Sequence, residues 1–310
     1  AAVQKHSALF KVMQQYRNYM DQIEKLNQQY QFQRAVNCPR DFMDLNVAPS
    51  DAEVTRGVET PLDEYDTPTN SMPNCKLELE WIYGFRGNDV RNNLAYLKTK
   101  ELIYTVATTV VIYNHRARKQ RFMSFHSQDV VTLCVHPDGV IVATGEDGSD
   151  HPKIIVWNSQ FVGSQCSKVL STIRGAHTHP ISFLQFSPNG KLLLSLALDA
   201  LHTVKVFDWQ ANRVIFSAGT DHRQVFGALW KSDTEFVTYG HSHLYFWQRS
   251  PVSQSKTTSF SRFHAILSRN AAIQRFTSAS LCCGEDSGYL VTGAANGRLY
   301  LWFERHLVFE

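Results

Sequence analysis

Five segments from Lys76 onward share one ending, a short apolar run that closes on an aromatic residue. Successive aromatic residues are 44, 50, 40 and 55 residues apart, and each of the last four follows a polar turn, an apolar run and a second turn. This order, at a period of about 40 to 45 residues, is typical of the blades of a WD-type β-propeller. We call the five aromatic residues the landmark residues: Tyr113, Trp157, Phe207, Trp247 and Trp302.

A propeller blade is a four-stranded sheet that cannot bury both of its faces alone. Each landmark residue is therefore expected on the third strand of its blade, packed against the next blade. The turns "HPDG" (136–139) and "SPNG" (187–190) fit this pattern, because proline presets φ and glycine accepts a positive φ. Five blades do not obviously close a ring, and "ERHLVFE" after Trp302 resembles the start of another strand. The predicted fold is all-β, five WD-type blades over residues 76–310 that belong to a larger or tandem propeller.

A different pattern occupies residues 1–35, where apolar residues recur at steps of three and four, the heptad spacing of a helix that packs on another helix. The positions are Leu9, Val12, Tyr16, Tyr19, Ile23, Leu26 and Tyr30. Three tyrosines are poor residues for a dimer core, which favours an amphipathic helix lying on its own protein or on a neighbour. A coiled coil that mediates self-association is the alternative.

Residues 36–75 read as an acidic, extended linker. The stretch from Asp41 to Asn74 contains four prolines and eight acidic residues with Arg56 as its only base, and it has neither helical nor strand periodicity. Two interpretations have equal weight: a disordered tether, or a segment that becomes ordered along the surface of a partner.

Charge and composition exclude several classes of protein. Residues 1–75 carry a net charge of −3 and residues 76–310 a net charge of +6. This mild surplus suits an acidic partner but falls far short of a dedicated nucleic-acid binder. No run of about 18 apolar residues is present to cross a membrane. The six cysteines have no framework spacing, which favours a reducing, intracellular compartment.

No constellation of residues predicts catalysis, a metal or another cofactor. His177 with His179, and His241 with His243, are metal-like pairs, but they lack nearby cysteine or carboxylate partners at the spacing of a zinc site. We expect these histidines to form hydrogen bonds with the backbone in blade turns. The loop "GEDGSDH" (145–151) lacks the residue order of a calcium-binding loop.

The opening stretch "KLELEWIYGFRGNDVRNNLAYL" and the later "VVIYN" resemble the hydrophobic (HELP) motif of the echinoderm microtubule-associated protein-like (EMAP-like) family. The blade sequences resemble the same family, so the resemblance covers residues 76 to about 303. It implies that the motif folds with a first propeller and lies where a second, atypical propeller packs. The resemblance further implies that the buried anchors of this junction are Trp81, Tyr83, Phe85 and Tyr96. At its edge, Arg86, Asp89 and Arg91 would form hydrogen-bonded pairs.

Two features depart from the family pattern. The family often has a basic, serine-rich linker after an N-terminal coiled coil, whereas residues 36–75 are acidic, and the second propeller is absent from these 310 residues. Two basic clusters could instead meet an acidic tubulin surface, although charged runs are usually only solvated. The candidate tubulin-contacting residues are Arg116, Arg118, Lys119 and Arg121 in the first cluster, and Lys256, Arg262 and Arg269 in the second.

The resemblance implies a non-enzymatic microtubule-associated protein of the cytoplasmic cytoskeleton that binds tubulin, with a structural role in the axoneme of a cilium or flagellum as its finer form. Other microtubule-associated or axonemal proteins would be further partners, and neither nucleic acid nor a membrane is expected. The competing interpretation is a WD-repeat scaffold that assembles proteins without touching tubulin. A propeller hydrolase or lyase would need convergent carboxylates or a metal set, which the blades do not show.

Overall fold

The computed structural model describes residues 79–87, 89–148, 151–160, 168–250, 259–267, 272–282 and 288–310, together with Lys25. The chain divides into two compact units, Ala1–Glu78 and Leu79–Glu310. The predicted helix and the acidic linker lie outside the described residues, apart from Lys25, which is helical. Within the described part of the chain, no helix is long and apolar enough to cross a membrane.

The second unit is built of antiparallel strands. They are β1 (Leu94–Tyr96), β2 (Leu102–Val106), β3 (Thr109–Asn114), β4 (Lys119–Met123), β5 (Val130–Val135), β6 (Ile141–Glu146), β7 (Ile154–Asn158), β8 (Val169–Ile173), β9 (Ile181–Phe186), β10 (Leu192–Ala197), β11 (Val204–Asp208), β12 (Arg213–Ala218), β13 (Val225–Ser232), β14 (Glu235–Gly240), β15 (His243–Arg249), β16 (Phe260–His264), β17 (Phe276–Leu281), β18 (Tyr289–Ala294), β19 (Leu299–Phe303) and β20 (His306–Phe309).

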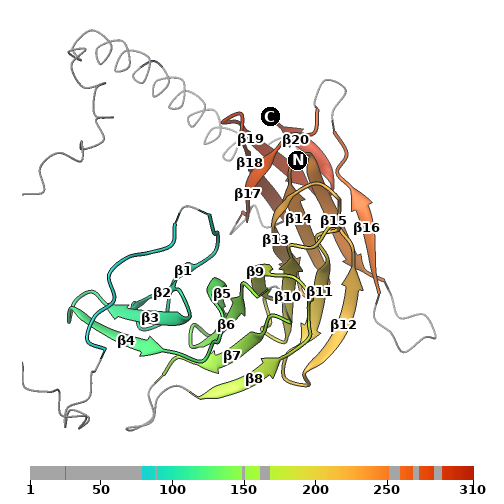
Figure 1. The fold of residues 1–310 in the computed structure, drawn as a ribbon. Helices are drawn as coiled ribbons and strands as arrows, with labels where there is room; N and C mark the ends of the chain where they lie inside the picture. Colours follow the sequence, from blue (N-terminus) through green and yellow to red (C-terminus); the bar gives the residue numbers. More distant parts are fainter. Residues whose placement is uncertain are drawn as a thin grey trace, which may run out of the picture. The chain divides into compact units, whose positions relative to one another are not determined.

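Each consecutive group of four strands forms one sheet, so the described residues contain five four-stranded sheets in chain order (Figure 1). The five landmark residues lie on β3, β7, β11, β15 and β19, the third strand of each sheet. This arrangement confirms the predicted propeller fold. The strand expected after Trp302 is β20, which pairs with β19 and therefore completes the fifth sheet rather than beginning another.

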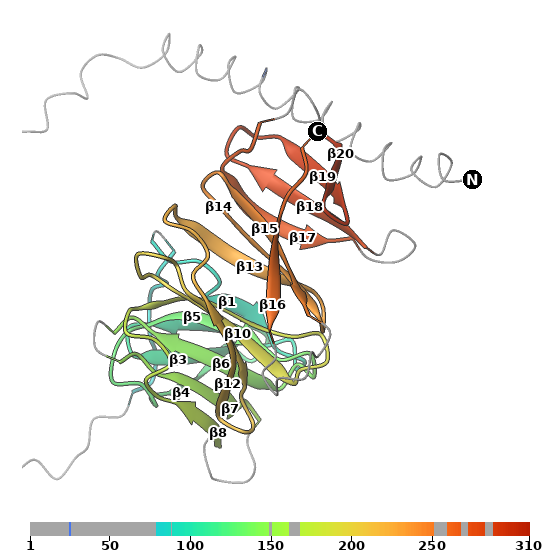
Figure 2. The same cartoon turned by 90° about the vertical axis from the view of Figure 1, so that its right-hand side faces the viewer.

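Successive sheets meet through their first strands. β5 contacts β1, β2 and β9, β9 contacts β13, and β13 contacts β17, so that the fifth sheet lies beside the fourth (Figure 2). Four apolar cores fill the spaces between neighbouring sheets. Because side chains alternate between the faces of a strand, the second, third and fourth sheets each contribute one face to the core before them and the other face to the core after them.

The landmark residues show which way each blade packs. Trp157 shares a core with Ile103 and Ile112 of the first sheet, and Phe207 shares one with Val156 of the second. Trp247 and Trp302 lie in the same relation to the sheets before them. The expectation that a landmark residue packs against the next blade was therefore wrong in direction. The sequence period reveals that an aromatic side chain must be buried but not which face of its strand it occupies.

Each landmark tryptophan also donates its indole N–H to a threonine on the neighbouring second strand. Trp157 donates to Thr144 at 3.3 Å, Trp247 to Thr238 at 3.0 Å and Trp302 to Thr292 at 2.9 Å. All three threonines are fully buried. A buried hydrogen bond that is lost leaves its partner unsatisfied, which costs about 1–3 kcal/mol. The repeated pair therefore holds each tryptophan in one orientation within its core.

We expect Thr238→Val to lower the free energy of unfolding by about 2–4 kcal/mol, because valine keeps the side-chain shape but removes the acceptor for Trp247 and the hydrogen-bond partner of His243. Denaturant unfolding at pH 7 measures the change. Thr234→Val, in the exposed turn between β13 and β14, is the matched control and should change the value by less than about 0.5 kcal/mol. A loss below 1 kcal/mol for Thr238→Val would contradict the role given to this pair.

Candidate functional site

In the described part of the chain, the segment before β1 packs on the face of the first sheet that is turned away from the second sheet. The Trp81 ring packs edge-on against the landmark residue Tyr113, with centroids 5.7 Å apart. The backbone of Ile82 forms two hydrogen bonds with the Gln120 side chain, at 2.8 and 3.1 Å, and Gln120 also donates to the Tyr104 hydroxyl at 3.0 Å. In the other blades the landmark residue packs against the preceding sheet. In the first blade the landmark residue Tyr113 packs against Trp81 instead.

The other side of this segment is exposed. On the segment itself Tyr83 is 86% exposed and Leu79 is also exposed, and on β1 Tyr96 is 65% exposed and Leu94 is exposed too. Phe85 is exposed as well but still touches the Tyr104 ring edge-on at 6.1 Å. The residues expected to anchor a junction with a second propeller thus divide into an inner contact at Trp81 and an apolar outer surface. The junction itself remains a prediction.

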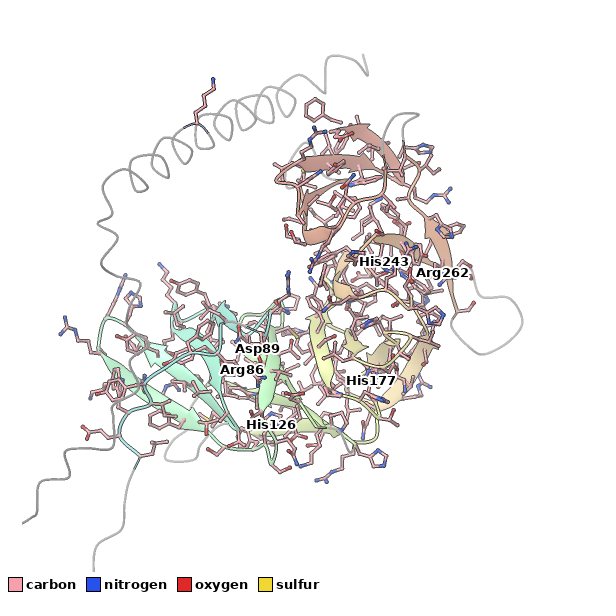
Figure 3. All side chains as sticks on the ribbon, turned by 45° about the horizontal axis from the view of Figure 1, so that its top comes forward. Arg86, Asp89, His126, His177, His243 and Arg262 are labelled. Atoms are coloured by element: carbon pink, nitrogen blue, oxygen red, sulfur yellow. The ribbon has the colours of Figure 1, made fainter. Side chains whose placement is uncertain are left out.

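Arg86 joins the segment to the second sheet. Its guanidinium binds Asp89 through two hydrogen bonds of 2.9 and 2.7 Å, and it also lies 3.5 Å from Asp129 and 3.6 Å from Asp147 (Figure 3). The hydrogen bond to Asp89 is the main cause that raises the pKa of Arg86, and the same bond lowers the pKa of Asp89. One cation therefore faces three carboxylates. We call these four residues, Arg86, Asp89, Asp129 and Asp147, the Arg86 cluster. The expected pairing of Arg86 with an acid occurs within the chain.

Arg91 and Asn92 form hydrogen bonds with the first strands of three other sheets. Asn92 accepts a hydrogen bond from the backbone N–H of Leu133 on β5 at 2.9 Å and donates its side chain to Leu184 O on β9 at 3.0 Å. Arg91 donates to the carbonyl oxygen of Thr277 on β17 at 2.8 Å. A φ of 58° at Asn92 turns the backbone, a conformation that asparagine tolerates better than most residues. Sequence analysis placed Arg91 at an interface edge and did not anticipate this link to the fifth sheet.

We call the part of the chain that contains Arg91 and Asn92 the crossing segment. A pocket of about 250 Å³ lies beside it. Its lining includes Arg86, Asp89, Arg91 and Asp147, with Phe226 of β13 as its large aromatic residue. The guanidinium carbon of Arg91 lies 4.8 Å from the centre of the Phe226 ring, and that of Arg275 lies 5.1 Å from it. Such contacts between a cation and an aromatic ring stabilise the position of an arginine. The pocket therefore combines aromatic, positive and negative groups.

Some residues of the predicted basic clusters are exposed, and others are held by contacts within the chain. Arg116, Arg118 and Lys119 are exposed in the turn between β3 and β4. Arg121 is half-buried and bonds to Glu101 at 2.6 Å. Arg262 donates to Thr220 O at 2.8 Å and lies over the Tyr245 and Trp247 rings. Lys256 and Arg269 lie outside the described residues.

The two histidine pairs are split between buried and exposed positions. His177 bonds to the Ser195 hydroxyl at 2.6 Å, and His243 bonds to the Thr238 hydroxyl at 2.8 Å and to Asp221 at 3.2 Å (Figure 3). The expected backbone partners were therefore wrong for these two residues, because each ring reaches across its sheet to a buried hydroxyl group. His179 and His241 are not buried in this way. Among the described residues, no group of three histidine, cysteine or acidic side chains is placed to hold a metal ion.

Burial governs the charge of these histidines. It lowers the pKa of both His177 and His243 to about 4, and for His243 it outweighs the opposite effect of Asp221. Burial would raise the pKa of Asp221, but the hydrogen bonds that it accepts from the backbone of Arg223 and from His243 lower the value to about 2. At neutral pH a neutral His243 therefore donates to an Asp221 carboxylate and accepts from Thr238, which in turn accepts from Trp247.

Sequence analysis missed a third such network at His126. Its ring contacts Thr144 at 2.7 Å and Glu146 at 3.1 Å, and Thr144 accepts from Trp157. A usable signal was present: "HSQDV" and "HTHPI" both place a histidine four residues before an inner strand. The three networks use buried ionisable groups to orient the landmark residues and their neighbours, so they serve the fold.

We expect stability to fall as the pH is lowered from about 6.5 to about 4. In the unfolded chain a histidine binds a proton below about pH 6.5, whereas in the folded chain His177 stays neutral until about pH 4. Between these values the unfolded state binds more protons, so lowering the pH favours unfolding. His177→Gln should therefore reduce the slope of unfolding free energy against pH by roughly 1 kcal/mol per unit between pH 6 and 5. Denaturant unfolding at each pH measures the slope. His179→Gln, at an exposed site two residues away, should leave it unchanged; an unchanged slope in both variants would refute the assignment.

Comparison with known proteins gives a consistent picture. Residues 119–308 match the family model described as the echinoderm microtubule-associated protein first beta-propeller, and residues 72–112 match the HELP motif. The chain is 29% identical to the 77 kDa echinoderm microtubule-associated protein of Strongylocentrotus purpuratus over 80% of its length and 36% of that relative. It is 32% identical to the human echinoderm microtubule-associated protein-like 1 over 74% of its length and 28% of that relative. The chain thus spans about a third of the length of these relatives.

Proposed function

Because this chain belongs to the echinoderm microtubule-associated protein family, we propose that it is a non-enzymatic microtubule-associated protein that binds the tubulin lattice through its propeller. One observation carries the proposal beyond the names of the relatives. Three exposed cations lie in the turn after β3 and at the first position of β4, and we call them the basic turn: Arg116, Arg118 and Lys119. The outer surface of tubulin is acidic, so a cationic turn presented by a rigid sheet suits it.

The basic turn has a defined shape. The side chain of Asn114 accepts hydrogen bonds from the backbone N–H groups of Arg116, at 3.1 Å, and Ala117, at 3.0 Å, which fixes the first half of the turn. Arg118 then adopts a φ of 50°, and β4 begins at Lys119. No carboxylate of the described residues forms an ion pair with Arg116, Arg118 or Lys119. These cations therefore point to solvent without an internal partner that binding would have to displace.

The remaining candidate cations contribute less to this proposal. Arg121 is held by Glu101, and Arg262 is held by Thr220 O and two aromatic rings. Contact with tubulin would break those interactions, which lowers the net gain. Lys256 and Arg269 stay in the proposal as a second cluster on charge alone.

The finer parts of the proposal concern place and partners. The proposed compartment is the cytoplasmic cytoskeleton, with the axoneme of a cilium or flagellum as the specific setting. Residues 1–35 would bind another microtubule-associated or axonemal protein, or a second copy of the chain. These parts are supported by the heptad pattern and by the family alone.

The apolar outer surface of the segment before β1 favours a second candidate function. Tyr83, Phe85 and Tyr96 are exposed beside Leu79, and clusters of exposed apolar side chains mark surfaces that bind proteins. A WD-repeat scaffold would use this surface to hold another protein domain without touching tubulin. The two functions separate in one assay, because a scaffold should not sediment with purified microtubules.

We expect the 310-residue chain to sediment with purified microtubules, and the triple variant Arg116→Glu, Arg118→Glu, Lys119→Glu to bind at least about tenfold more weakly at low salt. The variant should also show a flatter dependence of affinity on salt concentration, since fewer charges are screened. Co-sedimentation across a salt series, with and without the acidic tubulin tails, measures both effects.

A charge-matched control reverses three exposed cations on other sheets: Arg174, Lys191 and Arg213. It should change the affinity by less than about twofold, because these residues are far in the fold from the basic turn. If both triple variants weaken binding equally, only the net charge of the chain matters, and the proposal that the basic turn contacts tubulin is contradicted. Failure of the unmodified chain to sediment at low salt would favour the scaffold.

A further inference from the structure

Two arginines beside Phe226 carry a charge that no acid of the described residues matches; Arg91 lines the pocket, and Arg275 lies next to it on the Phe226 ring. Arg91 donates to a carbonyl oxygen, Thr277 O, and its guanidinium otherwise lies over the Phe226 ring. Arg275 lies over the same ring. Within the described ranges neither arginine forms an ion pair with a carboxylate. Both are exposed, and their guanidinium carbons lie 4.8 and 5.1 Å from the centre of the same aromatic ring.

The opposite imbalance occurs in the same pocket. In the Arg86 cluster one guanidinium serves Asp89, Asp129 and Asp147, so the cluster has a net charge of −2. Asp89 and Asp147 line the pocket together with Arg86 and Arg91. The side chains of Asp89 and Asp129 are about half exposed, at 50% and 51%, and have room to accept further hydrogen bonds. The pocket and its rim thus have a negative side, the Arg86 cluster, and a positive side, Arg91 with the neighbouring Arg275.

We propose that this pocket binds a peptide segment in which a carboxylate side chain lies close to a cationic one. Arg91 and Arg275 would hold the carboxylate, since arginine is well suited to carboxylate recognition. The Arg86 cluster would hold the cationic side chain, and Phe226 would pack against the aliphatic part of either. This assignment is independent of the proposed function, because no residue of the basic turn lines the pocket.

Charge and size select this occupant over others. A polyanion such as a nucleic acid or a run of glutamates would bring negative charge against the three aspartates, which like-charge repulsion disfavours. A lone cation would meet the same repulsion at Arg91 and Arg275. The volume of about 250 Å³ is below the range of about 300–1,000 Å³ that is usual for drug-sized ligands, so the pocket accommodates one or two side chains.

The test uses the whole chain and three blocked hexapeptides: alternating lysine and glutamate, all glutamate, and all lysine. Nuclear magnetic resonance follows the side-chain Nε–Hε signals of Arg86, Arg91 and Arg275 during titration at about 150 mM salt. We expect the alternating peptide to shift all three signals, with an affinity at least about fivefold higher than that of either homopolymer. An equal or stronger response to hexaglutamate or hexalysine would overturn the proposal, as would no shift with the alternating peptide.

Substitutions localise the binding. Arg275→Gln should weaken binding of the alternating peptide at least about fivefold, while Arg275→Lys should weaken it less, because the charge remains but the planar fork that pairs with a carboxylate is lost. Arg213→Gln, an exposed arginine on β12, is the matched control and should change nothing. Arg275 is preferred to Arg91 for this test because, among the described residues, its side chain forms no hydrogen bond to another strand, whereas Arg91 is bonded to Thr277 O. Unchanged affinity in Arg275→Gln would contradict the assignment.

Discussion

The burial of sheet faces against one another is the constraint on which the structure depends. A four-stranded sheet has two faces, and hydrophobic burial requires both to be covered. In the described residues, the four spaces between neighbouring sheets are filled by apolar cores, and Trp157, Phe207, Trp247 and Trp302 each lie in one of them. Among the described residues no sheet packs on the other face of the first sheet, and the segment that contains Trp81 contacts that face instead.

This constraint explains why much of the fold could be predicted from the sequence. The spacing of the landmark residues predicts one aromatic side chain for each sheet, and all five lie on the third strands. The direction of packing could not be predicted, because alternation along a strand does not say which face meets which neighbour. The strand after Trp302 was predicted, but the sequence did not show that this strand, β20, pairs with β19 and completes the fifth sheet.

The candidate site was predictable only in part. The sequence placed Arg86 near an acid, and local spacing explains the Asp89 contact because the two residues are three apart. Asp129, Asp147 and Phe226 come from other sheets, so no local pattern could have joined them to the segment before β1. The histidine networks were missed for a related reason. A histidine can satisfy either a backbone or a hydroxyl partner, and only the tertiary structure brings Ser195 within reach of His177.

The hydrogen bond from Arg91 to Thr277 spans 186 positions of the chain. During synthesis at about 5–20 residues per second, the donor would leave the ribosome roughly 10–40 seconds before its acceptor. Over that interval the crossing segment can bind β5 and β9 through Asn92 but not β17. The last link of this segment can therefore form only after the fifth blade has been translated, when the strands of the four preceding blades have already left the ribosome.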